Sequence, residues 1–177
     1  MTTALITLED YFEQDGKPDD QALQQNATMT IGRWNELLTV AAGEGILPTI
    51  DKTTGSFVAS GYRSPSHNAA TANAADHSKH LTCQALDVRD DRPDRPLAVW
   101  VMKHLQLAAD IGLWFEDPRW CWRNLDSSPT KAGTLPDGHP WVHGQIVPPG
   151  SGHRVYVPSI ALPGDPLFFQ RNGLELP

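Results

Sequence analysis

His80 and Asp87 are the first residues whose types and spacing indicate chemistry. His80 ends the polar stretch SKH, and Asp87 lies inside the apolar stretch QALDV. A carboxylate within a buried strand is costly in free energy unless it is paired or binds a cation. Zinc accepts imidazole nitrogen and carboxylate oxygen, and a catalytic zinc site uses three protein ligands and leaves a fourth position to water. The two residues therefore predict a zinc site that needs a second histidine.

His143 is the best candidate for the missing ligand. The segment WVHGQI is typical of a strand, in which Trp141 and His143 would point to the same face. The neighbours of His143 are apolar, so an imidazole without a partner would be unfavourable there. We expect His80, Asp87 and His143 to meet at one metal ion.

Three motifs in this order resemble the M15 family of zinc D-Ala-D-Ala peptidases, which belongs to the Hedgehog/DD-peptidase fold group. The family pattern S-x-H-x-x-G-x-A-x-D is matched by Ser78, His80, Ala85 and Asp87. Upstream, SGYRSPSHN is similar to the family's S-G-Y-R-S-P-x-x-N, and WVHGQ is similar to its closing W-V-H segment. The segments ITLEDYF and PPGSGHRVYVP also resemble small phage and prophage members, so the resemblance covers most of the chain.

The resemblance implies roles for several residues. It implies one bound zinc ion with the ligands His80, Asp87 and His143. It also implies that Arg63 steadies the scissile carbonyl or the anionic intermediate, and that Ser78 and Asn68 hold the loops of the site or contact substrate. Arg154 could bind a substrate carboxylate, because guanidinium pairs with carboxylates in a bidentate manner, although a surface ion pair explains it equally well.

Two positions depart from the family pattern. Cys83 occupies the glycine position, so either the loop backbone accepts a side chain there or the thiol lies close to the metal. The general base of the family usually stands three residues before the last ligand, where this chain has Pro140. His139 is the first alternative base, followed by Asp137 and Glu116, and only geometry can decide between them.

The spacing of apolar residues predicts the elements that position these groups. A helix is expected over residues 19–44, begun by Asp19 or Asp20, with a short helix over 66–73 and one further helix through Leu97, Val101, Leu105 and Ala108. Strands are expected at 57–60, 85–88, 112–115, 141–147 and 154–157, and a long loop over residues 117–140. We predict one α+β domain over residues 1–177, with a small, mainly antiparallel sheet flanked by helices and a metal-site core at about 56–157.

Composition argues against other classes of protein. The net charge of −7 and the pI near 5.4 argue against a nucleic-acid-binding surface, which needs clustered Lys and Arg. No apolar run reaches membrane-spanning length, and the first residues lack the features of a signal peptide. Cys83 and Cys121 are expected to be reduced thiols. We expect a monomer that is made in the cytoplasm and acts on the cell wall after lysis or dedicated export.

The expected activity is therefore hydrolysis of peptide bonds in peptidoglycan stem peptides. The resemblance admits either a D-Ala-D-Ala carboxypeptidase or an L-Ala-D-Glu endopeptidase, used for example in phage lysis. The alternative is a zinc-stabilised binding or structural module of the same fold, which kept the ligands and lost the base. The proline at position 140 keeps this alternative open.

Overall fold

The chain combines helices with one small sheet, as an α+β fold. The computed structural model describes residues 6–71, 74–118 and 141–156 of the 177-residue chain. Within them, five strands form a sheet in the order β1-β2-β4-β3-β5. The strands are β1 (Val58–Ser60), β2 (Ala85–Arg89), β3 (Trp114–Glu116), β4 (Trp141–Gln145) and β5 (Val155–Tyr156).

The sheet is mixed, with three antiparallel pairings and one parallel pairing. β1 with β2, β2 with β4 and β3 with β4 are antiparallel, as expected. β5 pairs parallel with β3, so the sheet is mixed, and the expectation of a mainly antiparallel sheet holds for three of the four pairings among the described residues. The reason lies in the connection after β4, since it carries the chain past β3 to the sheet edge. The returning strand then runs opposite to β4, and hence parallel to β3.

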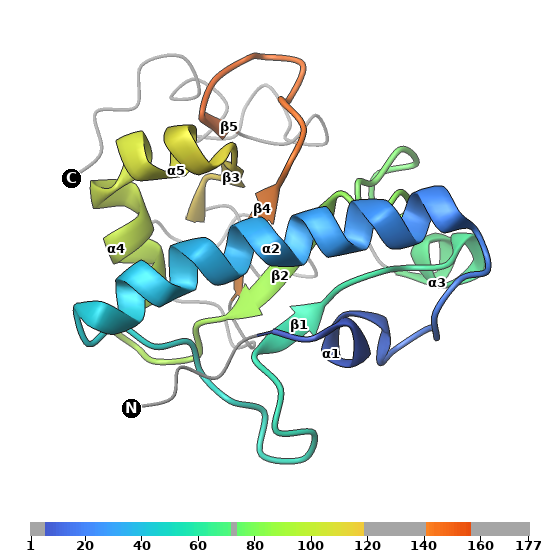
Figure 1. Cartoon of the computed structure of the whole chain (residues 1–177), viewed down its shortest axis with the longest axis horizontal. Coiled ribbons are helices and arrows are strands. Elements are labelled where there is room, and N and C mark those ends of the chain that lie inside the picture. The colour runs from blue at the N-terminus through green and yellow to red at the C-terminus, as the bar shows by residue number, and fades with distance from the viewer. Residues whose placement is uncertain (1–5, 72–73, 119–140, 157–177) are drawn as a thin grey trace, which may run out of the picture.

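The helix α2 (Gln21–Gly43) confirms the helix expected over residues 19–44. Its N-cap is Asp20, whose carboxylate accepts hydrogen bonds from the backbone N–H groups of Ala22 (2.7 Å) and Leu23 (3.4 Å). The helix runs across one face of the sheet (Figure 1). Its fully buried Trp34 meets Phe115 of β3 edge to face, with ring centroids 5.6 Å apart. This face of the sheet therefore forms the main core.

Two short helices accompany the first strand. The helix α1 (Leu8–Phe12) begins with a capping box, in which Thr7 and Asp10 bind each other's backbone N–H groups. It lies beside β1 at the lower side of the view in Figure 1. The helix α3 (Pro65–Ala70) starts one residue before the expected position and ends at Ala70, three residues before the expected end, with Thr71 as its C-cap.

The apolar repeat after residue 96 forms two helices, so the expectation of one continuous helix is wrong. They are α4 (Pro96–Lys103) and α5 (Leu105–Ile111), separated at His104. His104 has non-helical backbone angles, its ring stacks on Trp100 at 4.1 Å, and its Nδ1 lies 2.8 Å from the Trp100 carbonyl oxygen. This local contact competes with continuation of the helix.

The third expected strand also begins later than predicted. Gly112 ends α5 in the left-handed conformation with φ of 83°, so the chain becomes extended only at Trp114.

Among the described residues, no helix is long and apolar enough to cross a membrane.

Candidate metal centre

His80 is held by a backbone carbonyl that fixes its tautomer. The residue is 2% exposed, and its Nδ1 lies 2.6 Å from the Gly61 carbonyl oxygen. Because a carbonyl oxygen only accepts, Nδ1 carries the proton and Nε2 is left as the ligand atom. Nε2 lies 3.4 Å from Asp87 Oδ2. Burial lowers the pKa of His80, which favours the neutral ring that metal binding requires.

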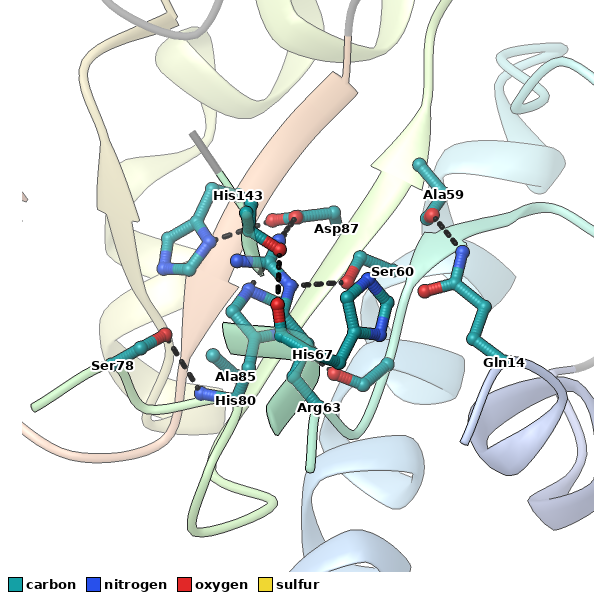
Figure 2. A network of polar contacts seen from close by, with 12 residues as sticks. Gln14, Ala59, Ser60, Arg63, His67, Ser78, His80, Ala85, Asp87 and His143 are labelled. Atoms are coloured by element: carbon teal, nitrogen blue, oxygen red, sulfur yellow. Dashed lines mark hydrogen bonds and ion pairs between the residues drawn. The ribbon is translucent and has the colours of Figure 1, made fainter. Parts of the chain in front are cut away.

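Asp87 lies at the centre of the cluster, in the middle of β2 (Figure 2). Its Oδ1 is 2.6 Å from His143 Nδ1, and its Oδ2 is 3.0 Å from a terminal nitrogen of Arg63. Burial disfavours the charged carboxylate, but His80 and His143 outweigh this and hold the pKa of Asp87 well below its usual range. The side chain that the sequence placed in an apolar strand is therefore ionised and compensated by its partners.

His143 faces Asp87 from the adjacent strand. The two residues are direct partners in the antiparallel register of β2 and β4. The His143 ring centroid lies 5.2 Å from that of His80. Burial opposes protonation, but the negative charges of Glu116 and Asp87 raise the pKa of His143 to about 9. A cation that binds here would therefore displace a proton from this ring.

The three expected ligands meet and fit a divalent metal. One potential ligand atom from each of His80, Asp87 and His143 lies within 4.8 Å of the others, and all three residues are buried. Two imidazoles and one carboxylate form a donor set of the kind found in catalytic zinc sites. The same donors also suit other transition metals, so the donor set supports a metal ion and its chemistry supports zinc as a proposal.

Arg63 lies directly beside this cluster. Its Nε donates to Ser60 Oγ at 2.8 Å, and its Nη2 donates to Asp87 at 3.0 Å. The side chain is 15% exposed. Because both bonds are made by the planar guanidinium, its orientation is fixed toward the carboxylate. The sequence expectation that Arg63 belongs to the site is consistent with this placement, and its role toward substrate stays a prediction.

Glu116 reaches the cluster from a third strand. β3 pairs with β4 through Trp114 with Gln145 and Phe115 with Gly144. Continuing this antiparallel register by one residue brings Glu116 beside His143. Of the groups that raise the pKa of His143, Glu116 has the largest effect, through its negative charge. Asp87, His143 and Glu116 therefore follow one another across β2, β4 and β3, an order that no local motif contains.

Ser78 and Asn68 have structural contacts near the site. Ser78 Oγ accepts a hydrogen bond from the backbone N–H of His80 at 3.4 Å, so it supports the loop of that ligand. Asn68 is 6% exposed and donates from Nδ2 to the Ala75 carbonyl oxygen at 3.1 Å. Both contacts agree with the expected role of holding the loops, and contact with substrate stays a prediction.

Arg154 lies at the edge strand, away from the cluster in sheet order. Its guanidinium stacks 4.1 Å from the centre of the Trp114 ring, and its Nη1 donates to the Leu113 carbonyl oxygen at 2.6 Å. These contacts fasten β5 to β3, and they give the residue a structural role that the sequence did not reveal.

His139 and Asp137, the first two expected bases, lie outside the described residues.

Cys83 belongs to the core, which answers the question raised by its position in the motif. Its backbone takes the positive φ of 55° that a glycine would favour, so the loop accepts a side chain. The side chain is fully buried among apolar residues and is not part of the metal-ligand group. Of the two alternatives for Cys83, the structure therefore supports a loop backbone that accepts a side chain, and not a thiol that binds the metal.

Comparison with known proteins adds no relative, since no family model, curated protein or solved structure matches this chain.

Proposed function

We propose that this protein is a zinc-dependent peptidase that hydrolyses peptide bonds in peptidoglycan stem peptides. The observation that carries the proposal is the buried group His80, Asp87 and His143, with the Arg63 guanidinium 3.0 Å from the central carboxylate. A metal site alone would be compatible with many different functions. A metal site with a fixed cation beside it suits a reaction in which negative charge develops on a carbonyl oxygen.

The metal would be held by the three side chains of the cluster. His80 presents Nε2 because the Gly61 carbonyl engages its Nδ1. When bound, a zinc ion supplies Lewis-acid polarisation of a carbonyl and lowers the pKa of a water molecule to about 7. The rest of the reaction depends on groups of the chain itself.

Arg63 supplies positive charge for the developing oxyanion. Its guanidinium is anchored through Ser60 and Asp87, so little reorganisation is needed when the substrate carbonyl becomes negative. A carboxylate or imidazole must also take a proton from the attacking water and deliver it to the leaving amine. Glu116 is the candidate that the register of β3 and β4 favours, and His139 and Asp137 are its alternatives.

The substrate class rests on the resemblance to M15 peptidases described above. The bond is either the terminal D-Ala-D-Ala bond or the L-Ala-D-Glu link, and the phage-like segments favour use in cell-wall lysis. Purified sacculi and defined stem peptides should be digested with zinc-loaded and chelated protein, and the products read by mass spectrometry. Release of D-Ala identifies a carboxypeptidase, and cleavage after L-Ala identifies an endopeptidase. Unchanged substrates with zinc-loaded protein would refute the peptidase proposal.

A second function is favoured by the proline at the usual position of the base. A zinc-stabilised module of the same fold would bind the metal through the same three residues and release no product from stem peptides. The digestion separates the two, because this module would gain thermal stability from zinc without any turnover.

A further inference from the structure

The end of α1 and the residues just after it contact the segment of chain beside the candidate metal centre. We define the N-terminal clamp as Tyr11, Gln14 and Asp15, and the arm as residues 59–67. Gln14 Nε2 donates to the Ala59 carbonyl oxygen at 2.9 Å (Figure 2), and the Tyr11 carbonyl oxygen accepts from the backbone N–H of Tyr62 at 3.1 Å. The clamp thus contacts the arm at its start and at its centre.

Asp15 fastens the far end of the arm. Its Oδ2 accepts from the backbone N–H of Ser64 at 2.6 Å, and His67 Nδ1 lies 2.9 Å from the same oxygen. The Asp15 side chain is 14% exposed, and hydrogen bonding from Ser64 and His67 outweighs burial and lowers its pKa. Asp15 is therefore an ionised anchor that joins two points of the arm.

The opposite side of the arm makes the contacts of the metal centre. Gly61 accepts from His80 Nδ1 at 2.6 Å, Ser60 accepts from Arg63 Nε at 2.8 Å, and Arg63 binds Asp87. The arm therefore supplies the partner that orients one ligand and the cation that contacts another. A displacement of the arm would move both.

There is little room for such a displacement at Gly61. A Cβ atom at this position would overlap the Tyr11 carbonyl oxygen, so clamp and arm are in direct contact. Tyr11 is 1% exposed, and its hydroxyl donates to the Ala85 carbonyl oxygen at 2.8 Å, two residues before Asp87 on β2. Tyr11 is thus bound both to the arm and to the strand that carries the central ligand.

We propose that the N-terminal clamp positions the metal centre. Asp15 and Tyr11 are positioning residues that hold the arm in place, and the arm in turn orients the His80 ring and the Arg63 guanidinium. The inference rests on the proposed metal site. Hydrogen-bond partners of metal ligands typically change metal affinity or activity by about 10 to 100-fold when removed. Because Asp15 acts through the arm, the loss expected on its removal is at the lower end, about tenfold.

The test is zinc affinity, measured by competition with a chromophoric chelator on the full chain. Asp15→Ala should weaken zinc binding about tenfold and change the visible absorption spectrum of the cobalt-substituted protein. Asp15→Asn keeps an oxygen that can accept from Ser64, so it should recover much of the affinity. The matched control is Asp10→Ala, which removes the carboxylate half of the α1 capping box and so loosens the same segment without removing a contact to the arm. It should bind zinc as the unchanged protein does.

The outcomes separate the clamp from the metal site itself. Equal zinc affinity in Asp15→Ala and the unchanged protein would overturn the clamp and leave the site intact. An equal loss in Asp10→Ala would also overturn it, because the effect would then be general loosening. Failure of the unchanged protein to bind zinc would refute the metal site on which the inference rests. If Asp15→Ala does not fold, Gln14→Ala removes the exposed contact to Ala59 and should weaken zinc binding in the same direction.

Discussion

Asp87 and His143 face each other across two antiparallel strands, with 2.6 Å between Asp87 Oδ1 and His143 Nδ1. Fifty-six positions separate them in the chain, and the register of β2 and β4 brings them together. Strands pair along their whole length, so the position of this contact depends on every residue pair of β2 and β4. The candidate metal centre therefore takes Asp87 and His143 from two paired strands, while Arg63 and His80 come from connecting segments.

Arg63→Lys should abolish most of the activity and weaken zinc binding by only about tenfold, because Arg63 is also a hydrogen-bond partner of the proposed ligand Asp87. Lysine keeps the charge, but it lacks the planar fork that binds Ser60 and Asp87 at once. Loss of one preorganised oxyanion partner typically lowers kcat about 100 to 1,000-fold. Steady-state kinetics on a stem peptide measure the first effect and chelator competition the second. An Arg63→Lys protein with full activity would show that the oxyanion is stabilised elsewhere.

Glu116→Gln should lower kcat about 100 to 10,000-fold, the range that general acid–base catalysis contributes. The amide keeps the shape of the side chain but cannot take a proton. Zinc affinity should change little, because Glu116 is not one of the three ligands. Glu9→Gln, an exposed acid on α1, is the matched control for the same chemical change. If Glu116→Gln retains normal kcat, His139→Ala and Asp137→Asn become the next variants to measure.

Gly144→Ala should destabilise the protein by about 1–3 kcal/mol, as overpacking of a core does. A Cβ atom there would lie 2.6 Å from Trp34 Cζ2 and 2.9 Å from Phe115 Cε1, which is too close. Gly32→Ala is the control, because a Cβ on that position of α2 meets no atom within 4 Å. It should stabilise the helix by roughly 0.5–1 kcal/mol. Urea denaturation measures both, and equal stability of the two variants would contradict the packing of α2 on β4.

The Cys83 thiol should be unreactive in the folded protein. Burial, with a smaller contribution from Asp20, raises its pKa to about 12. At pH 8 the reactive thiolate is then only about one part in 10,000 of the residue. In a Cys121→Ser background, a disulfide reagent should react with Cys83 only after unfolding. Rapid reaction in the native state would show that the thiol is exposed or its pKa is low.

The three residues of the candidate metal centre could be predicted to lie together from the sequence because each signal is local. An acid in an apolar run and a histidine on a strand are visible within a few residues, and both strands formed close to the expected bounds. The helix over residues 19–44 was predicted for the same reason, since its cap and its apolar face lie within one continuous segment.

Relationships set by strand order could not be predicted in this way. Glu116 was expected only as a third choice for the base, because its position beside His143 depends on β3 pairing with β4 across a long connection. The contact of Arg154 with Trp114 depends on the parallel pairing of β5. The anchoring of the arm by Asp15 joins residues 49 positions apart and has no motif.

Diffraction from crystals grown with zinc, recorded at the zinc absorption edge, tests the central claim most directly. One strong anomalous peak should lie between His80 Nε2, Asp87 and His143, and it should vanish in Asp87→Ala crystals grown under the same conditions. A peak at another position, or no peak in protein that binds zinc in solution, would contradict the claim that these three side chains hold one metal ion.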